Sequence, residues 1–221
     1  MHKYFILVLG LTMKMAFAQA PLGFIHLNKI CPTLIFEMSY DSIENFTGEV
    51  VRGYKAKSAF LAEVPAKALC RVQEKALKLG YTLKIYDSYR PVKAVSFFQE
   101  WAQRPETNFK VKELYYPNFS RLELFEQGYI AKQSSHSRGS AVDLSLSSID
   151  GMELDMGSRF DYFDDISHTY SPKISQQQRQ NRQLLKELME SEGFKNFSQE
   201  WWHYSYRPEP FPNDYFDFDV E

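Results

Sequence analysis

The chain has 221 residues, and its 26 lysines and arginines nearly balance 28 aspartates and glutamates, so the net charge is only −2. This balance gives no support for binding to nucleic acid or to an anionic membrane surface. With 44% hydrophobic residues, the length suffices for one domain with a substantial core. The two cysteines show no Cys-x-x-Cys spacing, which excludes a zinc site built on cysteines.

The first 18 residues are typical of a secretory signal peptide. A short basic start precedes an apolar run over residues 4–13, and Ala16-Phe17-Ala18 forms a small-x-small cleavage site. The alternatives are a buried first strand or a membrane anchor, but the apolar run falls short of the about 20 residues that span a bilayer. We expect cleavage before Gln19, export to the periplasm or the extracellular space, and no stable membrane anchor afterwards.

Residues 19–221 are expected to form a single domain. Removal of residues 1–18 takes two lysines and no acids, which shifts the net charge from −2 to −4. In an oxidising compartment Cys31 and Cys70 could form a disulfide, worth roughly 4 kcal/mol in the loop-closure model. Cysteine is also a common buried hydrophobe. The sequence leaves the disulfide and the oligomeric state open.

Periodic apolar residues predict three helices, over residues 65–79, 91–103 and 176–192. Alternating patterns predict strands over residues 81–86, 141–146 and 201–206. The irregular order of these elements favours an α+β domain in which helices flank a small, largely antiparallel sheet. Residues 108–133 are aromatic without clear periodicity, and we interpret them as a loop-rich wall of a cleft.

Arg90 follows the strand over residues 81–86 and is stiffened by Pro91. An arginine at a strand end can present its guanidinium to an oxyanion or to a substrate carboxylate. The alternative interpretation is a surface ion pair with Asp87.

His136 and Asp143 are two candidate metal ligands seven positions apart. They can reach one ion only if the backbone folds back, and Gly139 is placed to permit that turn. In the following strand Val142 and Leu144 alternate with Asp143, so the carboxylate points away from the apolar face.

Glu200 and His203 lie in an aromatic stretch whose composition favours a strand. We infer that Glu200 occupies the bend that enters this strand, beside the ion that His203 would bind. A catalytic zinc keeps three nitrogen or oxygen ligands and leaves a fourth position for water, and a nearby carboxylate can serve as acid and base. Taken singly, such a histidine is more often a packed core residue and such a glutamate a solvated one.

Together these segments resemble the zinc D-alanyl-D-alanine dipeptidases of the VanX type, a branch of the D-Ala-D-Ala metallopeptidases. The family's Ser-x-His-x(6)-Asp pattern matches Ser134, His136 and Asp143, and its Glu-x-x-His pattern matches Glu200 and His203. Trp201-Trp202 and the tail Tyr215-Phe216-Asp217-Phe218 resemble the dipeptidase branch rather than the related carboxypeptidases. The similarity covers essentially everything after the amino-terminal segment.

The resemblance implies one zinc ion per chain in a cleft on the sheet and a small D,D-dipeptide as substrate. In it His136, Asp143 and His203 hold the metal, Glu200 activates water, and Arg90 stabilises the transition state. It also implies that Ser134 and Asp161 hold the two ends of the substrate, whereas a turn hydroxyl and a surface acid are the ordinary interpretations.

Three functions remain to be separated. The first is a zinc dipeptidase whose catalytic domain comprises residues 19–221 and which hydrolyses D-alanyl-D-alanine. The second is a D,D-carboxypeptidase acting on peptidoglycan stem peptides, and the third is a zinc-stabilised cell-wall binding module without catalysis. Export favours cell-wall turnover or D-alanine salvage over glycopeptide resistance, which requires a cytoplasmic enzyme.

Overall fold

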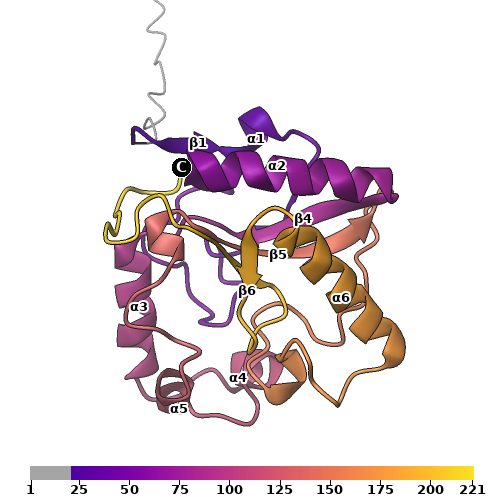
Figure 1. The fold of residues 1–221 in the computed structure, drawn as a ribbon. Helices are drawn as coiled ribbons and strands as arrows, with labels where there is room; N and C mark the ends of the chain where they lie inside the picture. Colours follow the sequence, from indigo (N-terminus) through magenta and orange to yellow (C-terminus); the bar gives the residue numbers. More distant parts are fainter. Residues whose placement is uncertain (1–20) are drawn as a thin grey trace, which may run out of the picture.

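The main sheet of the protein has five strands in the order β2-β4-β5-β7-β6 in the computed structural model, which describes residues 21–221 (Figure 1). Strand β2 pairs with β4 in parallel, and the other three pairings are antiparallel. The strands are, in sheet order, β2 (Ile35–Phe36), β4 (Tyr81–Asp87), β5 (Ala141–Ser148), β7 (His203–Tyr206) and β6 (Phe194–Asn196). This confirms the α+β prediction with a small, largely antiparallel sheet.

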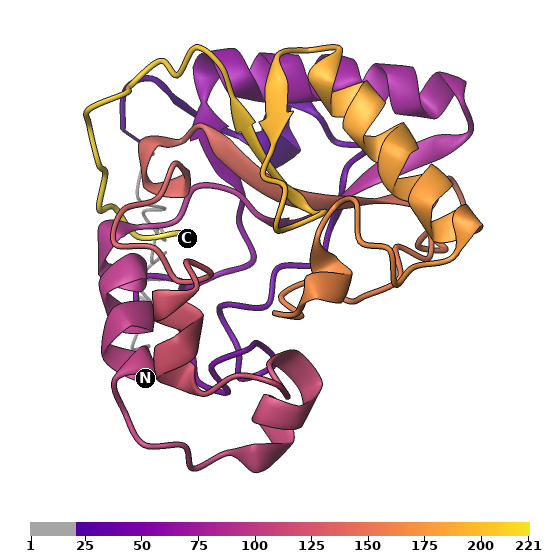
Figure 2. The same ribbon diagram turned by 60° about the horizontal axis from the view of Figure 1, so that its bottom comes forward.

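Helices α2 (Glu63–Lys78) and α6 (Gln176–Glu190) pack against this sheet, and a two-stranded antiparallel sheet made of β1 (Phe24–His26) and β3 (Phe60–Ala62) adjoins it. Figure 2 shows α2 and α6 on one side and α3, α4 and α5 on the other. The helices of the described part are α1 (Leu27–Ile30), α2 (Glu63–Lys78), α3 (Val92–Ala102), α4 (Phe109–Tyr115), α5 (Arg121–Glu126) and α6 (Gln176–Glu190), with 3₁₀ turns η1 (His136–Arg138) and η2 (Asp165–Ser167).

The three predicted helices and three predicted strands are confirmed, with shifts at their ends. Helix α2 begins at Glu63, so Pro65 lies in its first turn as predicted. It ends at Lys78, two residues before Gly80, whose φ is 83°. Strand β7 begins at His203 rather than at Trp201, because Trp201 and Trp202 form the turn that enters it. The predicted signal segment, residues 1–18, lies outside the described residues.

The prediction that residues 108–133 form a loop-rich wall is wrong for half of that stretch, because the short helices α4 and α5 take up 13 of its 26 residues. Asn108 caps α4 by accepting a hydrogen bond from the backbone of Val111, and Ser120 forms a reciprocal capping box with Glu123 at the start of α5. Such caps satisfy backbone N–H groups that short helices otherwise leave without partners. The segment after α5 is irregular and does form part of a cavity wall.

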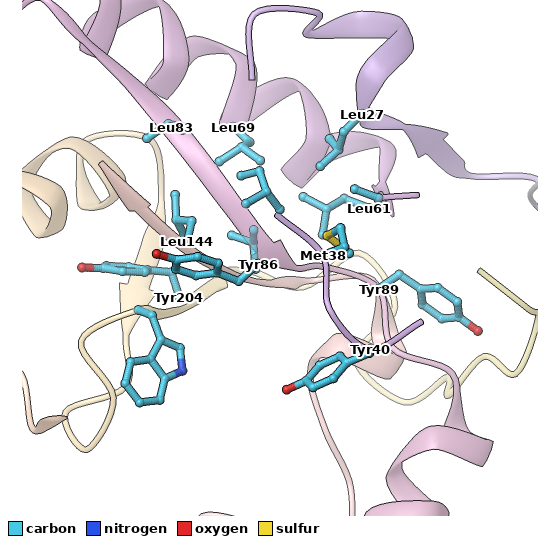
Figure 3. Packing of buried hydrophobic residues seen from close by; sticks show 14 of the residues in the cluster. Leu27, Met38, Tyr40, Leu61, Leu69, Leu83, Tyr86, Tyr89, Leu144 and Tyr204 are labelled. Carbon is cyan, nitrogen blue, oxygen red and sulfur yellow. The ribbon is translucent and has the colours of Figure 1, made fainter. Parts of the chain in front are cut away.

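Leucine side chains fill the space between α2 and the sheet, whereas aromatic side chains fill the opposite side. Figure 3 shows Leu69 and Leu27 on one side of β4 and Tyr40 on the other. Leu83 and Leu144, from adjacent strands, are fully buried in the same core. Burial of each such side chain stabilises the fold by about 1.5–3 kcal/mol, so the sheet is anchored from the α2 side.

Arg182 of α6 organises the long loop between β5 and α6. It is 1% exposed, and its guanidinium donates to the backbone carbonyls of Met156, Ile166 and His168. Burial lowers the pKa of Arg182 to about 10, which leaves it charged at neutral pH. Three charge-assisted hydrogen bonds thus hold the loop that carries Asp161.

Cys31 and Cys70 are free thiols in the structure, the first buried and the second partly buried. The Sγ atom of Cys70 lies 3.7 Å from the carbonyl oxygen of Ile30. Among residues 21–221 no helix has the length and apolar character needed to cross a membrane.

Candidate metal centre

Three adjacent strands place Asp87, Asp143 and His203 opposite one another. In the antiparallel register Asp87 of β4 is paired with Asp143 of β5, and Asp143 is paired with His203 of β7. Directly opposite residues of neighbouring strands have Cβ atoms about 4.5–5.5 Å apart on the same face of the sheet. Asp143 therefore points away from the apolar face of Val142 and Leu144, as its alternation predicts.

His136 reaches the same place from the η1 turn that precedes β5. The turn ends at Gly139, which has φ 65° and so confirms the predicted need for glycine there. A Cβ atom at position 139 would also overlap the Phe24 ring and approach the backbone nitrogen of Ala62 to 3.0 Å. Position 139 therefore excludes side chains for two independent reasons.

The side chains of His136, Asp143 and His203 converge on one point, with donor atoms within 4.8 Å of one another. The His203 Nδ1 atom lies 2.9 Å from Asp143 Oδ1 and 3.2 Å from His136 Nε2, and His136 Nε2 lies 3.3 Å from Asp143 Oδ2. Burial opposes a charge on Asp143, but the two imidazoles hold the pKa of its carboxyl well below the usual range. The arrangement provides one carboxylate and two imidazole donors.

The outer nitrogen of each imidazole has its own hydrogen-bond partner. His136 Nδ1 lies 2.5 Å from the carbonyl oxygen of Ser88, which can only accept, so Nδ1 carries the proton and Nε2 presents its lone pair to the centre. His203 Nε2 lies 3.2 Å from Ser205 Oγ, which is bonded in turn to Ser135 Oγ at 2.9 Å. These partners set the orientation of both rings.

Glu200 lies in the turn before β7, at the bend inferred from the sequence, and not in the strand itself. Its Oε2 atom is 3.9 Å from His203 Nδ1, and the residue is 9% exposed. Burial, assisted by the negative charge of Asp143, raises the pKa of Glu200 to about 8. A carboxyl with a pKa near neutrality can both take up and release a proton, as an acid and base must.

Arg90 faces the same centre from the end of β4. Its Nε donates to Asp87 Oδ2 at 2.9 Å, and its Nη2 lies 3.3 Å from Asp143 Oδ2. Asp87 also accepts a hydrogen bond from the Tyr54 hydroxyl at 2.8 Å. The ion pair with Asp87 considered from the sequence is thus present, but it is buried and orients the guanidinium rather than lying on the surface.

All seven predicted site residues line one cavity of about 200 Å³. Asp161 has its Oδ2 atom 2.7 Å from the Tyr40 hydroxyl, and burial raises the pKa of its carboxyl well above the usual range. Its φ of 57° is the one positive value among non-glycine residues of the described chain. Strained backbone of this kind clusters at binding sites. Ser134 lies two residues before His136, and its Oγ accepts a hydrogen bond from the backbone N–H of His136.

The sequence did not identify several residues on which this geometry depends. Asp87 was considered only as a surface partner of Arg90, because its pairing with Asp143 depends on a strand register that no local pattern reveals. Tyr40 and Tyr54 belong to none of the motifs that supply the site residues, and no signal in the sequence points to them. The functional roles of the seven predicted residues stay predictions, although the structure brings all seven together.

The donor set fits zinc. Two imidazoles and one carboxylate, with room for a further ligand, are the donors found in catalytic zinc sites, whereas magnesium and calcium prefer oxygen donors throughout. The buried outer partners of both imidazoles are also typical of zinc centres.

Comparison with known proteins identifies the family. A family model described as D-ala-D-ala dipeptidase matches residues 20–221. The D-alanyl-D-alanine dipeptidase of Enterococcus faecium is 45% identical over 201 residues, covering 90% of this chain and 99% of that protein. The enzyme of the same name from Enterococcus faecalis is 44% identical, and the match covers 90% of this chain and 98% of that protein. The chain therefore belongs to the D-alanyl-D-alanine dipeptidase family, a group of metallopeptidases.

One solved structure is also similar, a zinc-bound mutant of the vancomycin-resistance D,D-pentapeptidase VanY from a VanB-type cassette. Its TM-score is 0.41 and its identity 16%, and the match covers 67% of this chain and 73% of that one. At this distance the likeness adds nothing to the assignment of the site.

Replacing His203 with alanine is expected to remove metal binding, because two donors remain from a set of three. Metal content of the purified variant, measured by mass spectrometry, should fall from about one zinc per chain to near zero. Ser205→Ala, which removes only the outer partner of the imidazole, should retain zinc with affinity reduced by about 10- to 100-fold. Full zinc content in the His203 variant would contradict the assignment of this residue as a ligand.

Proposed function

We propose that this chain hydrolyses D-alanyl-D-alanine to two D-alanines as a zinc dipeptidase, with Glu200 as the acid and base. The observation that carries the proposal is the shared cavity, in which three metal donors, one carboxyl of raised pKa and one buried guanidinium surround about 200 Å³ of space. Membership of the family supports the same activity. A cavity of this size suits a dipeptide rather than a longer peptide.

Zinc, when bound, lowers the pKa of a water molecule from about 15.7 to about 7 and polarises a carbonyl group. Glu200 takes the proton from the attacking water and then delivers it to the nitrogen of the leaving amine. Arg90, held by Asp87, directs its guanidinium into the cavity, where it can stabilise negative charge that develops on the carbonyl oxygen. Metal retention and proton transfer thus belong to different residues.

Asp161 and Ser134 are proposed to bind the two ends of the substrate. A buried carboxyl whose recorded partner is the Tyr40 hydroxyl suits the ammonium group, because that cation would restore its ionised form. The Ser134 hydroxyl can donate to the substrate carboxylate. Both residues line the same cavity of about 200 Å³, so a substrate held at both ends must be short.

Two other functions are less well supported. A D,D-carboxypeptidase must admit a long stem peptide, and the segment from Gly128 to Gln133 contributes five residues to the wall of the small cavity. A binding module without catalysis has no need for Glu200 beside the metal donors. We therefore favour the dipeptidase over both.

The substrate assignment predicts release of D-alanine from D-alanyl-D-alanine and none from L-alanyl-L-alanine at the same enzyme concentration. A pentapeptide ending in D-alanyl-D-alanine should be a poor substrate because the cavity has no room for the preceding residues. Chiral chromatography of the products measures all three reactions. Faster cleavage of the pentapeptide than of the dipeptide would assign the enzyme to the carboxypeptidases instead.

Glu200→Ala is expected to bind zinc normally and to lose activity, since proton transfer by a positioned residue contributes about 10²- to 10⁴-fold to the rate. Turnover of D-alanyl-D-alanine and metal content should be measured on the same preparation. The control variant is Glu100→Ala, because Glu100 is exposed and does not line the cavity. Glu209 also lies outside the cavity wall but is unsuitable, because it contacts the η1 turn. Undiminished turnover in Glu200→Ala would rule out its role.

We propose that the enzyme is exported and acts in cell-wall turnover or D-alanine salvage. The support is the signal-like segment over residues 1–18, which precedes the catalytic domain proposed for residues 19–221. When the full chain is expressed in a bacterium, the mature protein should begin at Gln19 and fractionate outside the cytoplasm. Intact-mass measurement of each fraction tests this. An unprocessed chain in the cytosol would instead favour a role in depleting the precursor dipeptide, as glycopeptide resistance requires.

A further inference from the structure

The C-terminal segment, residues 207–220, joins the metal-binding turn to the start of α3. The backbone nitrogen of Phe216 donates to the carbonyl oxygen of Ser137 at 2.9 Å, and the carbonyl oxygen of Phe216 accepts from the nitrogen of Val92 at 3.1 Å. Ser137 follows His136 directly, and Val92 lies two residues after Arg90. One residue of the segment therefore ties together the two loops that carry His136 and Arg90.

Arg138, the last residue of the η1 turn, is bound to the same segment by its side chain. Its Nε and Nη2 atoms donate to the two carboxylate oxygens of Glu209, the second at 2.9 Å, and its Nη1 donates to the Tyr215 hydroxyl at 2.9 Å. The Glu209 side chain is 2% exposed and that of Arg138 13%. Arg207 also contacts Glu209, from the solvent side. A bidentate pair fixes orientation as well as distance.

We propose that Glu209 is a positioning residue for the metal centre and acts on His136 through Arg138. The η1 turn contains only three residues, with His136 at one end and Arg138 at the other, and it is closed by Gly139. A change in the position of the Arg138 end is passed along this short turn to the His136 imidazole, whose outer nitrogen is hydrogen-bonded to the Ser88 carbonyl oxygen and lies 3.8 Å from Asp87 Oδ2. Neither Glu209 nor Arg138 lines the cavity, so neither touches the substrate.

The inference rests on the proposed metallopeptidase function, and its main competitor is a purely structural ion pair. Removing one partner of a buried pair is strongly destabilising, whereas replacing both with apolar residues of similar volume is often neutral. A structural pair predicts that stability and activity recover together in such a double variant. A positioning pair predicts that stability recovers while the geometry of the metal centre stays altered.

The test compares wild type, Glu209→Gln and the double variant R138M/E209L. A matched control is provided by Arg121 and Glu106, a second buried bidentate pair that lies outside the cavity wall, as Glu106→Gln and R121M/E106L. Each protein is loaded with zinc for kinetics and with cobalt(II) for visible absorption, which reports the ligand geometry directly. Melting temperature and metal content are measured in parallel.

For both Glu209 variants we expect a kcat on D-alanyl-D-alanine about 10- to 100-fold lower at full zinc content, since small misplacements of catalytic groups cost rates of that order. KM should change less, because Asp161 and its partner Tyr40 make no contact with the η1 turn and keep their places. The cobalt(II) spectrum should shift in both Glu209 variants and in neither control. In R138M/E209L the melting temperature should return toward that of the wild type without recovery of kcat.

Wild-type kcat and an unshifted cobalt(II) spectrum in Glu209→Gln would overturn the proposal. So would joint recovery of melting temperature and kcat in the double variant. Failure of the wild-type enzyme to cleave D-alanyl-D-alanine would refute the proposed substrate instead, and the cobalt(II) spectra would still decide the role of Glu209. If R138M/E209L does not fold, Glu209→Gln decides the question, because it keeps the size of the side chain and one acceptor oxygen.

Discussion

Asp87, Asp143 and His203 occupy opposed positions on three neighbouring strands, and the rest of the site is assembled around that alignment. Backbone pairing in the sheet sets the separation between two metal donors and fixes the carboxylate that orients Arg90. Asp87 lies opposite Asp143 because the register of β4 against β5 shifts between Ile85 and Asp87. Since side chains alternate with a period of two, a slip of one residue between β5 and β7 would turn a donor to the α2 face. The leucine core against α2 therefore specifies the metal centre indirectly, because it opposes such a slip.

The third metal donor, His136, is positioned in a different way. It comes from a turn rather than a strand, so its position follows from a glycine at φ 65° and from contacts with the C-terminal segment. Glu200 likewise occupies a turn, immediately before β7. The sheet thus supplies rigid donors, while two turns at its end supply the groups whose placement requires support from distant parts of the chain.

Local patterns in the sequence were sufficient to predict α2, α3, α6 and the three longer strands, because each has a clear period and a proline or glycine near one end. The site residues were recognisable by type and spacing together with the family resemblance, and the bend at Glu200 followed from the period of two. The register between strands could not be predicted, since it depends on pairing between distant parts of the chain. For the same reason Asp87 was considered only as a surface residue, whereas it is buried opposite Asp143. Helices α4 and α5 were missed because seven and six residues are too few to establish a period, although Ser120 and Glu123 show a capping pattern.

The contact between Gly139 and the Phe24 ring links the amino-terminal strand β1 to the turn that carries His136. Position 139 cannot take a side chain while Phe24 is present, because the space that a Cβ atom would need is already filled by the aromatic ring. Phe24 in turn packs against Phe216 and Phe218 of the C-terminal segment. An exchange of strand β1 between two homologues must therefore preserve the fit of its phenylalanine both to position 139 and to the C-terminal segment.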